Sequence, residues 1–171
     1  MKLIELGQII VPTPRNRSIK SILAEHPNKK FMSDNQIYDC SGSFLDSLEG
    51  APESTPRDFY CLNNNLTSLE FAPRVVNGDF DCSTNPDIKS LKNIHKQILT
   101  IKGTFYADNN WKMNSNLLGL LLIDGLKGAV LTDKNIQKIM WKYFEKPNKK
   151  LAMLQCQQEL IEAGFEDAAQ L

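Results

Sequence analysis

Hydrophobic and polar positions in the middle of the chain recur at a fixed interval. Cys40, Cys61 and Cys82 are separated by 21 residues each time. An aromatic residue stands two positions before each cysteine, a small polar residue three positions after it, and two aliphatic residues follow. Coil by coil, these positions are Tyr38, Ser43, Leu45 and Leu48; Phe59, Asn64, Leu66 and Leu69; and Phe80, Asn85, Ile88 and Leu91. The pattern is aromatic-x-Cys-x-x-Asn-x-Leu-x-x-Leu.

A weaker fourth copy starts at Phe105, with Ala107 and Asn110 at the cysteine and asparagine positions. An interval of about 20–29 residues, with a strand followed by Asn or Cys, is typical of leucine-rich repeats. The aromatic residue and the cysteine would alternate inward on one strand per coil, and the asparagine would bond backbone groups at the turn. One coil cannot bury its own apolar face. We therefore predict an α+β fold: a short leucine-rich-repeat-like solenoid with parallel strands and three to four coils.

The flanking segments are predicted to close both ends of one single domain, residues 1–171, because a chain of 171 residues has the length of one domain. Residues 1–36 are expected to form an N-terminal strand-helix cap, residues 37–110 the repeat solenoid, and residues 111–171 a C-terminal helical cap. In the first cap we expect a strand over residues 1–11. A short helix would follow, capped by Asn16 and ending before Pro27, with Ile19, Ile22 and Leu23 on its inner face.

The C-terminal cap contains two clear helical patterns and one ambiguous segment. Residues 114–126 are apolar enough for a buried helix or a buried strand, and periodicity does not separate the two. Thr132 or Asp133 is expected to cap a helix that Pro147 ends, with Trp141 partly exposed beside its apolar face, which comprises Ile136, Ile139, Met140, Tyr143 and Phe144. A last helix over residues 151–163 stops at Gly164. Its inward residues are predicted to be Leu151, Leu154, Leu160 and Ile161.

Charge narrows the class of partner. The chain has 20 basic and 20 acidic side chains, so bulk charge would not hold it on nucleic acid, and we do not expect a nucleic-acid partner. The repeat is mildly acidic, with six basic and ten acidic residues over positions 37–110. The longest apolar run, residues 117–123, is too short to span a membrane. Glu5 interrupts the apolar N-terminus, which argues against a secretory signal. We expect a cytoplasmic protein with reduced cysteines and no membrane contact.

Candidates for catalysis or metal binding are sparse. Zinc sites usually use cysteines in close pairs, whereas Cys40, Cys61 and Cys82 are far apart in sequence and would stack as small hydrophobic residues. We therefore predict no metal, no cofactor and no catalytic residues. An alternative is a small enzyme whose site lies between the repeat and the C-terminal cap. It would use His95, Asp108 and Asp124, although no nucleophile motif accompanies them.

The outward positions of the predicted strands form the stronger candidate site. If Phe59 and Cys61 point inward, their neighbours point outward, and stacking places aspartates and tyrosines on one face. Solenoids commonly bind partners on such a face. Tyrosine supplies contact area, and aspartate suits a basic or amide-rich partner. An ordinary solvent-facing surface is the alternative. The candidate partner-binding residues are Asp39, Asp58, Tyr60, Leu62, Asp79, Asp81, Tyr106 and Asp108.

Three stretches resemble the leucine-rich-repeat-like accessory proteins encoded by large tailed bacteriophages. They are residues 58–70 (DFYCLNNNLTSLE), residues 77–83 (NGDFDCS) and, more weakly, residues 156–165 (CQQELIEAGF). The chain departs from that family at Phe71, where glycine is usual. The resemblance implies a non-catalytic protein-binding module that modulates or inhibits a bacterial host or defence protein in the host cytoplasm. A virion or scaffold component is the alternative, and the sequence indicates no oligomeric state.

Overall fold

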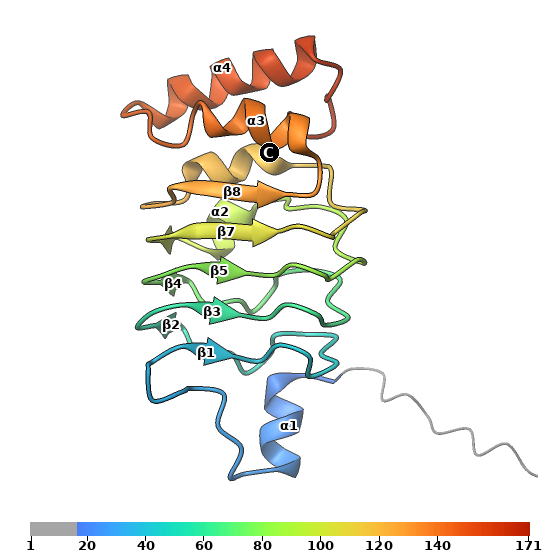
Figure 1. The fold of residues 1–171 in the computed structure, drawn as a ribbon, viewed down its shortest axis with the longest axis vertical. Coiled ribbons are helices and arrows are strands. Elements are labelled where there is room, and N and C mark those ends of the chain that lie inside the picture. Colours follow the sequence, from blue (N-terminus) through green and yellow to red (C-terminus); the bar gives the residue numbers. More distant parts are fainter. Residues whose placement is uncertain (1–16) are drawn as a thin grey trace, which may run out of the picture.

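The computed structural model describes residues 17–171 and shows an α+β protein with two parallel sheets (Figure 1). The larger sheet has the strand order β1 (Tyr38–Asp39), β3 (Phe59–Tyr60), β5 (Phe80–Asp81), β7 (Thr104–Ala107) and β8 (Gly128–Leu131). The smaller sheet contains β2 (Ser54–Thr55), β4 (Val75–Val76) and β6 (Thr100–Ile101). The helices are α1 (Ile19–Glu25), α2 (Ile94–Gln97), the 3₁₀ helix η1 (Leu117–Leu122), α3 (Lys134–Trp141) and α4 (Lys149–Glu162).

The register of the larger sheet follows the sequence repeat. Tyr38 lies opposite Phe59, Phe59 opposite Phe80, and Phe80 opposite Phe105. The four rings form a buried column whose successive centroids are 5.5, 5.2 and 5.5 Å apart. Two positions later, the cysteines form a second buried column. The predicted inward alternation of aromatic residue and cysteine is confirmed.

The buried asparagines hold neighbouring coils together. Asn64 accepts a bond from the Leu45 amide through Oδ1 (2.9 Å), and its Nδ2 donates to the carbonyls of Cys40 and Cys61 at 3.1 and 3.0 Å. Asn85 repeats this arrangement one coil further along. Each side chain therefore satisfies backbone groups at the bend after the strand, as the sequence predicts.

The sequence prediction of one strand in each of three to four repeats gives too few strands. The larger sheet has five strands because β8, inside the predicted helical cap, pairs with β7. There, Ala129 stands opposite Phe105 and Leu131 opposite Ala107. Strand β8 therefore has neither an aromatic residue nor a cysteine at its two inward positions. The smaller sheet adds a second strand to three of the repeats. Its strands are only two residues long, which is too short for an alternation of apolar and polar residues to be detected in the sequence.

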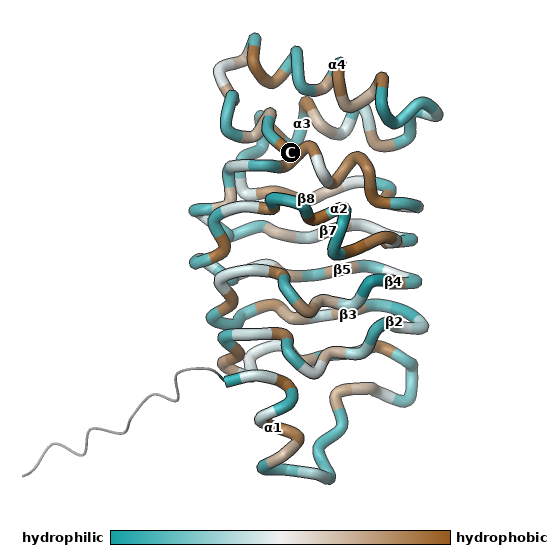
Figure 2. The backbone as a smooth tube through the Cα atoms, turned by 180° about the vertical axis from the view of Figure 1, so that it is seen from behind, coloured by the Kyte–Doolittle hydropathy of each residue, from teal (hydrophilic) through white to brown (hydrophobic). Residues whose placement is uncertain are grey.

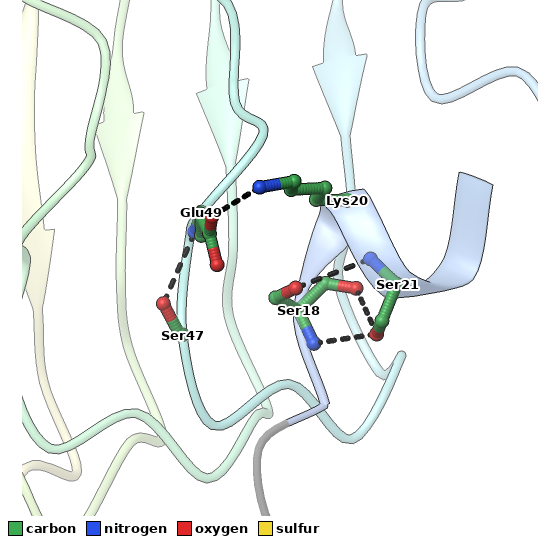
Figure 3. Close-up of polar contacts among 5 residues, drawn as sticks. All are labelled: Ser18, Lys20, Ser21, Ser47 and Glu49. Atoms are coloured by element: carbon green, nitrogen blue, oxygen red, sulfur yellow. Dashed lines mark hydrogen bonds and ion pairs between the residues drawn. The ribbon is translucent and has the colours of Figure 1, made fainter. Parts of the chain in front are cut away.

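The N-terminal helix is capped by Ser18 rather than by Asn16, which lies with the expected strand of residues 1–11 outside the described residues. Ser18 Oγ accepts from the amide of Ser21, and Ser21 Oγ accepts from the amide of Ser18 (Figure 3). Lys20 ties α1 to the first coil through Glu49, with Nζ 2.8 Å from Oε1. Gly50 permits this approach, since a Cβ there would lie 2.6 Å from the Lys20 amide nitrogen.

Helix α3 covers the open edge of β8 with three side chains. Gln137 Oε1 accepts from the Leu131 amide (2.9 Å), Lys134 Nζ donates to the Leu131 carbonyl (2.6 Å), and Trp141 Nε1 donates to the Ala129 carbonyl (2.5 Å). These bonds occupy backbone groups that an uncovered edge strand would offer to another chain. Trp141 is nevertheless 50% exposed, as expected from its place beside the apolar face.

The other helix boundaries agree only partly with the sequence. Asp133 is the N-cap of α3, one of the two expected residues, but α3 ends at Trp141, well before Pro147. The ambiguous segment 114–126 contains the 3₁₀ helix η1. Gly164, at φ +82°, follows the end of α4 as predicted.

The predicted inner face of α4 is largely wrong. Of the four residues expected to point inward, only Leu160 is buried, together with Ala152 and Cys156. Leu151, Leu154 and Ile161 are instead 51%, 56% and 44% exposed.

The buried thiols are expected to make the folded protein less stable at alkaline pH. Burial raises the pKa of Cys40 and of Cys156 to about 12, and it raises the pKa values of Cys61 and Cys82 well above the ordinary 9.0. The unfolded chain therefore releases these protons first as the pH rises. Below pH 9 the thiols are protonated in both states and their contribution to stability is complete. Above pH 9 the free energy of unfolding falls by roughly 1 kcal/mol per pH unit for each buried thiol that stays protonated in the folded protein.

Urea unfolding at pH 8 and pH 10 checks this prediction. The free energy of unfolding should fall between the two, and it should fall less in Cys82→Ala, which lacks one buried thiol. The variant is a matched control because the tyrosines and lysines that also titrate are unchanged in it. An equal fall in both proteins would contradict the assignment to the thiols.

Candidate functional site

The outer side of the larger sheet aligns aspartates and tyrosines in one row. Asp39 lies opposite Tyr60, Tyr60 opposite Asp81, and Asp81 opposite Tyr106. We call these four residues the Asp–Tyr row. Neighbouring members belong to strands that are about 4.8 Å apart. Asp39 is exposed and the other three are partly buried, because each side chain is flanked by those of the adjacent strands.

Two further aspartates of the predicted site hold the strands in register. Asp58 Oδ1 accepts a bond from the Asp79 amide (2.9 Å), and Asp79 Oδ1 accepts one from the Thr104 amide (2.8 Å). Glycine precedes each donor, since a Cβ at Gly78 or Gly103 would lie 2.0 or 2.1 Å from the carboxylate oxygen. Asp58 and Asp79 therefore stabilise the sheet on the same face where the sequence predicts binding.

Tyr60 is fixed in place by its neighbours. Its hydroxyl donates to Asp58 Oδ2 at 3.1 Å. Partial burial, the bond to Asp58 and the negative charges of Asp58, Asp79 and Asp81 raise the pKa of Tyr60 to about 12. The phenol therefore stays protonated at neutral pH and remains a hydrogen-bond donor. A held aromatic ring loses little conformational entropy when a partner packs on it.

The last predicted residues lie where the strands turn. Asp39 and Asp81 each accept a bond through Oδ1 from the amide two residues later, at 2.9 and 2.8 Å. Asp108 Oδ1 accepts from the hydroxyl of Ser83 at 2.6 Å. Leu62 is partly buried beside them. The register and these bonds place six of the eight predicted residues on one side of the larger sheet, and Leu62 and Asp108 follow strands β3 and β7.

Val130 continues the row beyond the predicted residues. It lies opposite Tyr106 on β8 and is partly buried. Sequence reasoning missed it because β8 carries neither of the two marker residues. The available signal was the short apolar run of residues 128–131, which begins 24 residues after Thr104.

The three residues of the alternative enzyme site each contact other parts of the protein. The His95 ring lies against η1, where a Cβ at Gly119 would be 3.1 Å from Nδ1. Burial and the nearby Lys96 lower the pKa of His95. Asp124 pairs with Lys149 Nζ (2.9 Å), and Asp108 bonds Ser83. Over residues 17–171, no hydrogen bond or ion pair links any two of His95, Asp108 and Asp124.

Among residues 17–171, no three or more His, Cys, Asp and Glu side chains are grouped so that they could hold a metal ion. None of the helices described in that range is long and apolar enough to cross a membrane. No family model, curated protein or solved structure matches the chain.

Proposed function

We propose that the chain is a leucine-rich-repeat-like solenoid that acts as a non-catalytic protein-binding module, with the Asp–Tyr row at the centre of its binding face. The observation that carries the proposal is the register: it aligns Asp39, Tyr60, Asp81 and Tyr106 across four strands. Two acidic and two aromatic side chains alternate along a surface that bonds between strands keep rigid.

The charge of this face favours a basic partner. Five carboxylates lie on it, at Asp39, Asp58, Asp79, Asp81 and Asp108. Two of them are held by backbone amides of the next strand and so keep a fixed position. Acidic groups in fixed positions speed encounter with a basic surface and define its orientation. Tyrosine is enriched at the centres of interfaces because its ring supplies area and its hydroxyl supplies a hydrogen bond.

The resemblance in residues 58–70 and 77–83 suggests the biological setting. In this proposal the protein is a phage accessory protein that binds a bacterial host or defence protein in the host cytoplasm and modulates or inhibits it. The basic or amide-rich surface of that partner would cover the Asp–Tyr row.

The test is capture from bacterial lysate with the tagged chain, followed by mass spectrometry and by affinity measurement with the purified partner. The double variant Tyr60→Ala/Asp81→Asn removes one ring and one charge but retains the oxygen that accepts from the Ser83 amide. Two central residues of this kind together are expected to weaken binding about 100-fold or more. The variant should melt somewhat lower, because the Tyr60 ring is partly buried, but it should remain folded at the temperature of the binding measurement.

The matched control is Glu70→Ala/Leu99→Ala, which removes one charge and one apolar side chain from exposed positions beside the smaller sheet. It should leave the affinity unchanged. Salt supplies a second readout, because 1 M salt shortens the screening length to about 3 Å and should weaken an acidic–basic interface. Equal binding by wild type and the Tyr60/Asp81 variant, or no stoichiometric partner in lysates from several hosts, would refute the proposal.

A further inference from the structure

Helix α4 is apolar on both sides. Its buried residues are Ala152, Cys156 and Leu160. On a helix with 100° per residue, Leu151, Leu154 and Ile161 fall within one stripe on the opposite side, which also contains the exposed Gln158. Each of these three side chains is about half exposed. Apolar residues at this spacing normally face a packed surface, so the outer stripe lacks a counterpart within residues 17–171.

The stripe lies at the end of the stacked strands. Helix α4 packs on η1 and α3 and forms the outermost layer at the C-terminal end (Figure 1). Hydrophobic and hydrophilic residues alternate along its length (Figure 2). A terminal unit of a stacked array needs a polar outer face to remain soluble by itself. Three large aliphatic side chains on that face indicate that another surface covers it.

The charges around α4 indicate what that surface is. Lys146 and Lys150 lie at the N-terminal end of the helix, whereas Glu162 and Glu166 lie at its C-terminal end. The macrodipole favours the reverse order, with acidic residues at the N-terminus. Over residues 17–171, neither the Lys146 nor the Lys150 side chain forms an ion pair. A surface with its acidic end at these lysines and its basic end at these glutamates would be complementary.

We propose that this surface is α4 of a second copy of the chain, packed antiparallel across a two-fold axis. The apolar stripes then meet, with Leu151 towards the end where Ile161 of the second copy lies and Leu154 beside Gln158 of the second copy. The basic end of each helix lies beside the acidic end of the other. The two helix dipoles are antiparallel, which is the favourable arrangement. A two-fold axis makes the contact self-complementary and closes it at two subunits.

The contact is small. A 14-residue helix is about 21 Å long, and a single pair of such helices buries less than the roughly 1,600 Å² of a standard interface. We therefore expect a weak dimer, with a dissociation constant in the micromolar range or above. The dimer leaves both Asp–Tyr rows uncovered by α4, so this inference stands independently of the proposed function.

Sedimentation equilibrium of the full chain from about 1 µM to about 1 mM tests the proposal. The mass should rise from monomer to dimer and stop there. Leu154→Glu places a charge within the stripe and should weaken the dimer more than tenfold. Its melting temperature should be unchanged, because the side chain is 56% exposed. Leu99→Glu is the matched control, since Leu99 is also exposed but lies beside β6, and it should dimerise like wild type.

Charge reversal tests the antiparallel arrangement. Lys150→Glu would place acidic groups of both copies together and should weaken the dimer several-fold, although a negative charge there favours helix α4 itself. Adding Glu162→Lys should restore much of the affinity. In a parallel pair, Lys150→Glu only exchanges one like-charged contact for another. Unchanged affinity in Lys150→Glu, a dimer indifferent to Leu154→Glu, or a monomer at every concentration would each overturn the proposal.

Discussion

Replacement of Asn85 by alanine is expected to lower the free energy of unfolding by about 3 kcal/mol or more. The Asn85 side chain is fully buried. It accepts from the amide of Leu66 (3.2 Å) and donates to the carbonyls of Cys61, Cys82 and Ser83 (3.1, 2.9 and 3.3 Å). Alanine leaves the Leu66 amide unpaired in the interior, which costs about 1–3 kcal/mol. Each of the three carbonyls also loses one of its two donors, although Asn64, Asn110 and the Asn63 amide still bond them.

The measurement is urea unfolding followed by circular dichroism, with Asn65→Ala as the control. Asn65 is exposed and directly follows the buried Asn64, so the same substitution there should change stability by about 0.5 kcal/mol at most. A loss below 1 kcal/mol in Asn85→Ala would mean that water or a backbone shift supplies the missing partners. The bridging role described for the asparagines would then be wrong.

Replacement of Phe80 by alanine should cost about 3–5 kcal/mol. Phe80 is the third ring of the buried column, between Phe59 at 5.2 Å and Phe105 at 5.5 Å. Its removal opens a cavity between two fixed rings, and the hydrogen bonds of the flanking strands prevent the column from closing over it. Both the burial of the ring and its contacts with the neighbouring rings are lost.

Thermal unfolding compares this variant with Phe44→Ala. Phe44 is 70% exposed, so its replacement should alter stability by about 0.5 kcal/mol at most. Phe80→Ala should melt far below wild type, or fail to fold at all. In the second case, Phe80→Leu supplies the measurement, since it retains part of the buried volume. Similar melting temperatures for Phe80→Leu, Phe44→Ala and wild type would contradict the column as the centre of the core.

The sequence predicts the columns well because each is marked by a distinctive residue type. An aromatic side chain two positions before a cysteine fixes both the inward direction and the register, and the buried asparagine fixes the turn. The same reasoning fails at β8, where Ala129 and Leu131 fill the two columns. These residues pack as well at the end of the sheet, where β8 contacts α3, but they do not stand out in a sequence.

The α4 helix shows a second limit of sequence reasoning. From the sequence, the four large aliphatic residues are predicted to point inward, although Leu160 lies on the other side of the helix from Leu151, Leu154 and Ile161. In the structure the stripe with Ala152 and Cys156 is buried, because small side chains let α4 approach η1 closely. Side-chain size therefore misled the prediction, since the distance between two helices cannot be inferred from the pattern of one.

The candidate site was predicted as a face but not as a set of bonds. Alternation along a strand places Asp58 and Asp79 outward, and they do lie there. Their bonds reach the backbone of the next strand, which no periodicity reveals. Gly78 and Gly103, each directly before the residue that donates, were the available signal.

The unequal coils have a consequence for how such a chain can change over time. From Phe59 to Phe80 the interval is 21 residues, but from Phe80 to Phe105 it is 25, and η1 lies within the next interval. The added residues form α2 and η1 rather than strands of the larger sheet. Insertions on that side leave the register of the larger sheet intact. Duplication or loss of one 21-residue unit would likewise add or remove a strand without disturbing the remaining pairs. The number of strands can therefore change readily in this architecture, whereas the spacing between residues of the Asp–Tyr row stays fixed.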